Sequence, residues 1–218
     1  MTSRTTSRTP LVRRSRSNLW HYQLCALNSS HIEEHLPVPP TVQLQPFSSA
    51  DFSRLISWIT TPEMLIQWAG PTQFSFPLSN EQLQRYLSGA EGAAPSRKIF
   101  AATDTSGQVI GHIELGALDY ANQSGSVCRV LVAPVLRGRG FSVPIVQETL
   151  RIGFEELGLR RIELRVYSFN AAAISCYRRA GFVQEGLLRQ ALKVGNECWD
   201  TVLMAILREE WESRPPDP

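Results

Sequence analysis

The sequence predicts an α/β domain in which a mixed β-sheet is flanked by helices. Two kinds of apolar pattern lead to this expectation: alternation at every second position, as in strands, and recurrence every three or four positions, as in helices. The two kinds follow one another along the chain, and 218 residues, 43% of them apolar, can bury one sizeable core. The expected order is a strand, helices, three strands, a helix, a strand, a helix and two strands.

The first half of the domain is expected to hold one strand and three helices. Residues 41–47 alternate as a strand does, with Val42 and Leu44 facing inward. Residue types that favour helix N-termini then open each helical stretch: a serine, a proline in a first turn, and a second serine. The expected helices are 48–60, 61–70 and 79–89.

The second half is expected to complete the sheet. A Ser-Gly-Gln turn joins two strands into a hairpin, and a Gly-Asn turn joins the last two. The helices between them end at Gly158 and Gly181, because glycine suits a helix C-terminus. The expected strands are 97–104, 109–119, 124–134, 160–167, 186–194 and 198–207, and the expected helices are 143–159 and 170–182.

Charge and proline content divide the chain into three parts. Residues 1–40 carry five arginines and two acids, and they end in a proline-rich stretch that suits a linker. We expect 1–40 to be a flexible Arg/Ser/Thr-rich extension, either without function or a targeting segment, 41–211 to be the domain, and 212–218 to be a disordered tail. The other residues, 41–218, carry 17 basic and 18 acidic side chains, so the globular part is not expected to bind nucleic acid.

Several classes of protein and site are not favoured by the sequence. No segment approaches the roughly 20 apolar residues of a membrane span, and none resembles a signal peptide, so we expect a cytoplasmic protein without a membrane partner. The four cysteines form no C-x-x-C pair and the histidines show no ligand spacing with them, so no metal is expected. Cys128 and Cys176, among apolar neighbours, are expected to be small core residues.

A turn that holds two arginines and two glycines separates the strand at 124–134 from the following helix. Gly138 and Gly140 allow close approach of a ligand to the main chain, and Arg137 and Arg139 add positive charge. A helix N-terminus after such a turn suits a phosphate, although a structural turn with solvated arginines would look the same. The Gly-Lys-Ser/Thr of a P-loop is missing, and Val143 occupies the third glycine position of a dinucleotide fingerprint.

Residues 130–142, VLVAPVLRGRGFS, resemble the acyl-CoA pyrophosphate loop of the GNAT superfamily of N-acetyltransferases. Its pattern is Arg or Gln, two spacers, Gly, one spacer, and Gly or Ala; Arg137 and Gly140 match the first two fixed positions and Ser142 replaces the last. The segment 170–186 resembles a second motif of the same superfamily, with matches at Asn170, Tyr177, Gly181 and Phe182. The chain is most similar to the branch that acetylates ribosomal-protein N-termini.

The resemblance implies the GNAT fold, a mixed six- to seven-stranded sheet, and acetyl-CoA as co-substrate without a metal. It implies that the arm of acetyl-CoA lies against the main chain of β-strand residues and that the loop and Asn170 bind the rest. The residues implied to bind the cofactor are Val130, Leu131, Val132, Arg137, Gly138, Arg139, Gly140, Phe141, Ser142 and Asn170.

The resemblance also implies direct attack of an amine on acetyl-CoA. Tyr177 is the expected general acid for the CoA thiolate, with helix packing as its alternative role. Glu114 is the expected base that accepts the amine proton, ahead of His112 on the same strand face and of Asp119. Each of these three side chains could instead be a solvated outward group.

The acceptor and the assembly state remain open at this point. The acceptor is expected to be a primary amine, either a protein N-terminus or a small molecule, and a homodimer is kept open. Trp58 and Trp68 could form an acceptor wall or pack in the core. The alternative function is a CoA-binding sensor or regulatory module of the same fold without turnover.

Overall fold

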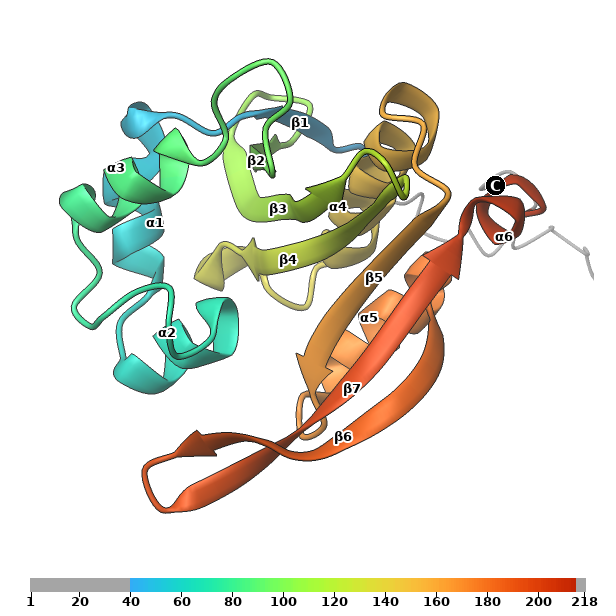
Figure 1. Ribbon diagram of the computed structural model, residues 1–218. Coiled ribbons are helices and arrows are strands. Elements are labelled where there is room, and N and C mark those ends of the chain that lie inside the picture. The colour runs from blue at the N-terminus through green and yellow to red at the C-terminus, as the bar shows by residue number, and fades with distance from the viewer. Residues whose placement is uncertain (1–39, 215–218) are drawn as a thin grey trace, which may run out of the picture. The chain divides into compact units, whose positions relative to one another are not determined.

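The protein is represented by a computed structural model that describes residues 40–214 and contains a seven-stranded sheet in the order β1-β2-β3-β4-β5-β7-β6 (Figure 1). The predicted extension, apart from residue 40, and the last four residues of the predicted tail lie outside the described residues. The strands are β1 Gln43–Pro46, β2 Lys98–Thr103, β3 Val109–Asp119, β4 Ser124–Val132, β5 Arg161–Tyr167, β6 Val183–Val194 and β7 Glu197–Leu207.

Two groups of helices lie around this sheet. The first three helices gather beside β1 to β4, and α4 and α5 lie together behind the sheet in the view of Figure 1. The helices are α1 Phe52–Trp58, α2 Pro62–Ala69, α3 Asn80–Ser88, α4 Ser142–Arg151, α5 Ala171–Ala180 and α6 Arg208–Glu212. The predicted mixed α/β fold is therefore confirmed.

Each face of the sheet carries its own hydrophobic cluster, and β2 contributes side chains to both clusters. Phe100 and Ala102 pack with residues of α4 and α5, whereas Ile99 and Ala101 pack with residues of α1 to α3. Successive side chains of a strand point to opposite faces, so a strand buried on both faces reads as an apolar run. The sequence KIFAAT of β2 has this character.

Side-chain caps fix where the helices begin. The side chain of Thr61 accepts a hydrogen bond from the Met64 N–H at 3.2 Å at the start of α2, where Pro62 occupies the first position. The Ser79 hydroxyl accepts one from the Gln82 N–H at the start of α3. Both N-termini fall where the sequence predicts them, because caps are local signals.

Two features differ from the sequence prediction. The predicted helix 143–159 is α-helical only to Arg151, and Ile152–Glu156 continue it as a wider π turn that brings Gly153 against the Ile162 side chain of β5. The short helix α6 follows β7 directly and was not predicted. Its Trp211 packs on Phe154 with ring centroids 5.9 Å apart.

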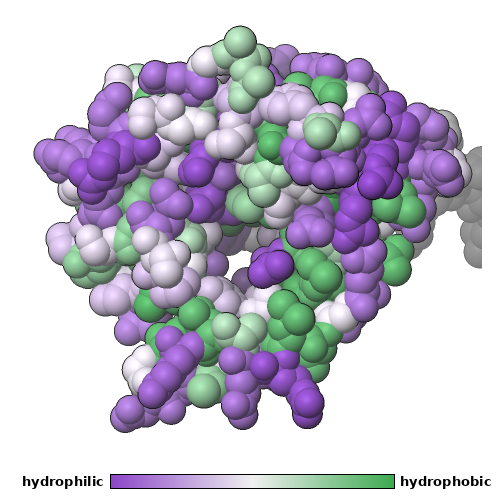
Figure 2. All heavy atoms as spheres, in the orientation of Figure 1, coloured by the Kyte–Doolittle hydropathy of each residue, from purple (hydrophilic) through white to green (hydrophobic). Residues whose placement is uncertain are grey.

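β4 and β5 form the one parallel pair of the sheet, and they stay together only briefly. Their register covers Ser124–Ser126 against Arg161–Glu163, after which the strands diverge. Beyond that point β4 remains paired with β3 on its other side. Figure 2 shows the molecule hollowed near its middle, on the side of α2 that faces β5 and β7.

Candidate functional site

A cleft of about 850 Å³ lies between β4 and β5 where the two strands separate. One wall is the diverging part of β4, from Ser126 to Val132, and the other is the end of β5. The loop before α4, residues of α5, the end of α2 and side chains of β6 and β7 also line it, the last being Leu188, Ala191, Leu192 and Thr201. The cleft therefore exists because two neighbouring strands stop pairing.

The β4 edge that faces the cleft has main-chain groups without a strand partner. β4 pairs with β5 only as far as Ser126, so the groups of Val127 to Val132 on that side have no ladder to join. Two of the carbonyls are bound by side chains: the Trp68 indole N–H donates to the Arg129 carbonyl at 2.9 Å, and Arg137 donates to that of Val132 at 3.3 Å. The remaining groups are available to an extended polar ligand.

A β-bulge shapes the middle of this wall. Arg129 has a φ of 51°, in the left-handed region that residues other than glycine rarely adopt, and the register of β3 against β4 shifts between His112 and Glu114. The hydrogen bond from Trp68 holds the Arg129 carbonyl in this arrangement. The bulge turns the main chain of the next residue, Val130, relative to the regular ladder.

The loop of two arginines and two glycines lies at the end of the same wall. Gly138 and Gly140 have φ values of 76° and 87°, and at both the left-handed backbone, rather than crowding, favours glycine. Phe141 and Ser142, at the start of α4, line the cleft, and Phe141 in the N-cap position makes no side-chain capping hydrogen bond, so the first N–H groups of that helix lie beside the cleft. A helix N-terminus reached through such a loop suits phosphate.

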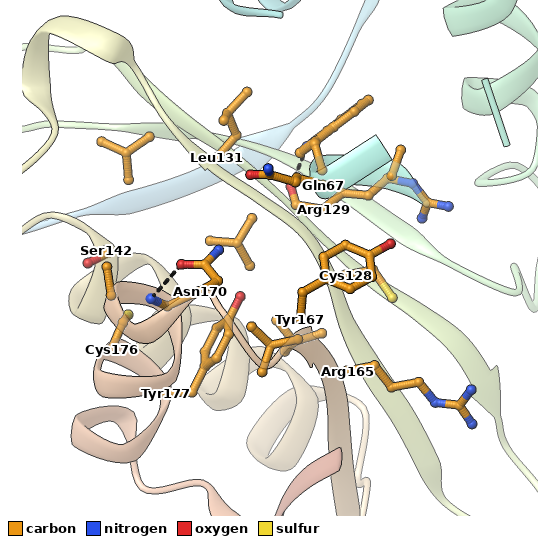
Figure 3. Close-up of a pocket in the computed structure, with 18 of the residues that line it drawn as sticks. Gln67, Cys128, Arg129, Leu131, Ser142, Arg165, Tyr167, Asn170, Cys176 and Tyr177 are labelled. Atoms are coloured by element: carbon orange, nitrogen blue, oxygen red, sulfur yellow. Dashed lines mark hydrogen bonds between the residues drawn. The ribbon is translucent and has the colours of Figure 1, made fainter. Parts of the chain in front are cut away.

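Asn170 and Tyr177 extend from α5 on the opposite side (Figure 3). The Asn170 Oδ1 accepts a hydrogen bond from the Ala173 N–H at 3.1 Å, so this residue caps the helix while lining the cleft. The Tyr177 hydroxyl has no hydrogen-bond partner within residues 40–214. Burial, and to a lesser extent Cys176 and Cys128, raise the pKa of Tyr177, so its phenol is protonated at neutral pH.

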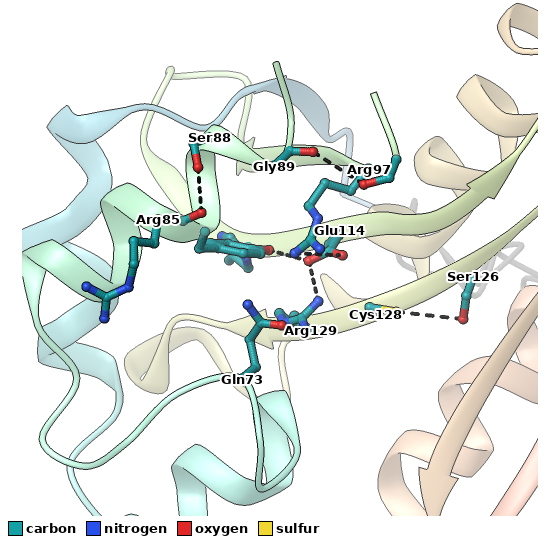
Figure 4. Close-up of polar contacts among 12 residues, drawn as sticks. Gln73, Arg85, Ser88, Gly89, Arg97, Glu114, Ser126, Cys128 and Arg129 are labelled. Atoms are coloured by element: carbon teal, nitrogen blue, oxygen red, sulfur yellow. Dashed lines mark hydrogen bonds and ion pairs between the residues drawn. The ribbon is translucent and has the colours of Figure 1, made fainter. Parts of the chain in front are cut away.

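Glu114 lies behind the cleft wall in a cluster of buried polar groups (Figure 4). Its carboxylate forms an ion pair with Arg129, accepts a hydrogen bond from the Tyr86 hydroxyl at 2.6 Å, and lies 4.0 Å from an Arg97 nitrogen. The side chains of Glu114 and Arg129 are 3% and 13% exposed. Burial is the main reason that the pKa of Tyr86 is raised well above its usual range.

His112 shares the buried strand face with Glu114, as the alternation of the sequence predicts. Its ring touches Phe47 and Trp68, and its Nε2 lies 3.3 Å from the Tyr86 hydroxyl. Burial, with a smaller contribution from Arg129, lowers the pKa of His112 to about 3, so the ring is neutral at pH 7. Asp119, the third candidate for the base, instead accepts hydrogen bonds from Asn122 in a turn.

Most of the predicted site residues meet in the cleft. Among the described residues, those predicted from the sequence that line it are Val130, Leu131, Val132, Arg137, Gly138, Gly140, Phe141, Ser142, Asn170 and Tyr177. Arg139 and Glu114 are not among its lining residues. Of the two tryptophans, Trp68 lines the cleft and Trp58 packs in the cluster of α1 to α3.

Other lining residues were missed as site residues. Cys128, expected in the core, is half-buried on the cleft wall, while Cys176 is buried as expected and also reaches the cleft. Arg129, Arg165, Tyr167 and Arg179 also line it. The alternation of β5 is the one sequence signal that could have placed Arg165 and Tyr167 on a common face. No local pattern in the sequence indicates the bulge at Arg129.

The proteins of similar sequence described below are named as N-acetyltransferases. The sequence profile of the acetyltransferase (GNAT) domain matches residues 41–183. The SPbeta prophage-derived uncharacterized N-acetyltransferase YokL of Bacillus subtilis is 30% identical over 137 residues, 63% of this chain and 76% of that protein. The spermidine N(1)-acetyltransferase of Vibrio cholerae is 30% identical over 115 residues, 53% of this chain and 66% of that protein. The putative ribosomal N-acetyltransferase YdaF of Bacillus subtilis is 29% identical over 106 residues, 49% of this chain and 57% of that protein.

The solved structures that are similar share the fold. The spermidine N-acetyltransferase of Vibrio cholerae in complex with CoA and spermine has a TM-score of 0.70 and 22% sequence identity, covering 79% of this chain and 99% of that chain. A mutant form of the Vibrio cholerae enzyme has a TM-score of 0.68 and 23% identity, covering 80% of this chain and 98% of that chain. In the sequence matches, the aligned part spans from 57% to 76% of the three relatives.

The buried His112 gives the protein a stability that depends on pH. Its pKa is about 3 when folded and 6.5 ordinarily, so below pH 6.5 the unfolded chain binds a proton that the folded chain does not. We expect this histidine to reduce the free energy of unfolding by up to about 1.4 kcal/mol for each pH unit below 6.5. Urea unfolding of wild type and His112→Gln between pH 7 and about 5 should give a flatter dependence for the variant; parallel curves would contradict the burial of His112.

Proposed function

Since the chain belongs to the GNAT family of N-acetyltransferases, we propose that it transfers an acetyl group from acetyl-CoA to a primary amine by direct attack in a ternary complex. The observation that carries the proposal is the cleft between β4 and β5, which ends on the loop from Arg137 to Ser142. Unpaired main-chain groups along one wall and a helix N-terminus at its end suit a long polar ligand with phosphates.

The residues of the cleft fit acetyl-CoA in two parts. The loop glycines and the start of α4 would hold the pyrophosphate, with Arg137 adding charge. The main chain from Val130 to Val132 would bind the arm as a neighbouring strand would, and Asn170 lies across from it. Acetyl-CoA supplies an activated acyl group, and no metal-binding group of three or more His, Cys, Asp or Glu occurs within residues 40–214.

Three groups of the chain would act on the reaction. A main-chain N–H after the bulge at Arg129 would donate to the thioester carbonyl oxygen and stabilise the negative charge that develops there. The Tyr177 phenol, which is protonated and has no hydrogen-bond partner among the described residues, would donate its proton to the leaving thiolate. Glu114 would accept the amine proton through a water molecule, because its own carboxylate does not line the cleft.

Relatedness alone does not select the acceptor. One relative is named for spermidine and another is a putative ribosomal N-acetyltransferase. None of the helices within residues 40–214 combines the length and the hydropathy that a bilayer crossing requires. A cytoplasmic location and a homodimer remain predictions.

The first prediction concerns the ligand of the loop. Titration calorimetry of the full chain should show saturable binding of acetyl-CoA, and neither NADH nor ATP should bind comparably at matched salt. Gly140→Asp should abolish the binding because it places a negative charge beside the phosphates and strains a φ of 87°. Arg139→Glu should weaken it by charge reversal. If acetyl-CoA fails to bind the folded wild type, the transferase proposal falls; binding without turnover would point to a sensor module.

The second prediction concerns the proton that the thiolate receives. Tyr177→Phe should lower kcat by roughly 10²-fold or more, the range for a general acid, and should change the Kd for acetyl-CoA little. Phenylalanine keeps the ring that packs against Phe182, so the fold is retained. Steady-state kinetics and calorimetry on the same preparation separate the two effects. Unchanged kcat would remove Tyr177 from the mechanism.

The third prediction concerns Glu114 as the base. Glu114→Gln should lower kcat/KM at pH 7 by about tenfold or more, and activity should recover as the pH approaches the pKa of the amine itself. The reason is that an amine deprotonated in solution no longer needs a group to take its proton. A pH profile of CoA release tests this, with unfolding curves as a control for the lost ion pair. An equal loss at every pH would assign Glu114 a purely structural role.

A further inference from the structure

The charged side chains around the cleft are all of one sign. Within residues 40–214, the lining includes no aspartate, glutamate, lysine or histidine, and its charged members are Arg129, Arg137, Arg165 and Arg179. An acetyl-CoA site explains positive charge, because the phosphates need it. It does not explain arginines that lie away from the phosphate loop.

The four arginines lie toward two ends of the cleft. Arg137 belongs to the loop before α4, and Arg179 lies with Ser142 near Cys176, so both belong to the cofactor end. Figure 3 shows Arg129 and Arg165 on the opposite side of the view from Ser142 and Asn170. Arg165 is exposed on β5 and forms no ion pair with any described residue. This second pair lies away from the loop that we assign to the phosphates.

The cluster behind Arg129 has more positive charge than its one carboxylate can balance. Arg97 and Arg129 share Glu114, while His112 and Tyr86 are uncharged at pH 7. The Nε groups of both arginines are buried and have no hydrogen-bond partner in the described part of the chain. These Nε atoms are too buried to meet a ligand, but the two guanidinium charges exceed the single charge of Glu114, and this unbalanced charge would attract an anion in the cleft beside Arg129.

We propose that the acceptor amine of this enzyme carries an anionic group, a carboxylate or a phosphate, that Arg129 and Arg165 bind. The inference rests on the proposed function, since it names the substrate class of the same site. A guanidinium binds either anion through paired N–H donors. A polyamine, in contrast, would bring additional positive charge into a cleft that has no carboxylate among its described lining residues.

The positive charge of these arginines would also favour loss of the amine proton before the amine attacks. An amine must lose a proton before it attacks, and nearby positive charge disfavours the ammonium form and lowers its pKa. Arg129 lies in the strand whose bulge faces the thioester, so its field acts on the reacting amine. With a carboxylate acceptor bound, that carboxylate and Glu114 would offset two of the three charges of Arg97, Arg129 and Arg165, and the remaining positive charge would disfavour the ammonium form.

The test compares amines that differ only in the charge at their far end. Primary amines of matched carbon chains, ending in methyl, carboxylate, phosphonate or ammonium, are assayed by CoA release with the full chain and saturating acetyl-CoA; spermidine is included. We expect kcat/KM for one carboxylate or phosphonate series to exceed that of the matched diamines by roughly tenfold or more. The two anionic series distinguish a carboxylate acceptor from a phosphorylated one.

Two arginine variants and one control assign the effect to the cleft. Arg165→Gln should reduce kcat/KM for the anionic amine by roughly 10- to 100-fold and leave that for the methyl-ended amine within a few-fold. Because Arg129 also pairs with Glu114, Arg129→Gln should lower kcat/KM for both amines, and its effect on recognition is the additional loss for the anionic amine relative to the methyl-ended one. Arg85→Gln makes the same change on α3, where Figure 4 shows the side chain pointing away from the cluster, and should change neither. Arg165 is exposed, so its variant tests the proposal even if Arg129→Gln fails to fold.

The outcomes separate this inference from the proposed function. If acetyl-CoA does not bind, the transferase proposal itself fails. If acetyl-CoA binds but spermidine or the diamines react better than every anionic amine, only the present inference is overturned. Failure of all anionic amines to react at up to about 10 mM, beyond the usual range of KM, would overturn it as well.

Discussion

The site depends on a single constraint, which is that β4 and β5 run parallel and stop pairing after three residues on each strand. A parallel pair normally continues along both strands, and its main-chain groups satisfy one another. Here the separation leaves one edge of β4 without a partner while β3 still holds its other edge in place. The edge that faces the cleft thus keeps main-chain groups without a strand partner, while β3 holds the strand in place.

Arg129 connects this opening to the core of the domain. Its carbonyl is bound by the Trp68 indole of α2, and its guanidinium is bound by Glu114 of β3. A left-handed arginine costs of order 1 kcal/mol or more, and these two contacts keep it in that conformation. The helix α2 therefore does more than cover one face of the sheet, because its Trp68 holds the bulge that shapes the cleft wall.

Local signals made much of this architecture predictable. The caps at Thr61 and Ser79, the loop with Gly138 and Gly140, and the helix that carries Asn170 all depend on residues close in sequence. The separation of β4 from β5 depends on pairing between distant segments, and a left-handed arginine carries no sequence signature. For that reason alternation could place Glu114 and His112 on one strand face, but it could not identify Arg129 and Arg97 as partners of Glu114.

The charged residues described as lining the cleft are all arginines, so the same positive charge bears on ligand binding and on the reaction of the amine. In the enzyme that we propose, arginines at one end would bind the phosphates of CoA, and arginines at the other end would disfavour the ammonium form of the acceptor. A cleft of this kind needs less from a dedicated base, since the field itself shifts the amine toward its neutral form. It also discriminates by repulsion, because each additional positive charge on an acceptor is opposed by the same arginines. Selectivity and activation of the amine then follow from one arrangement of charge.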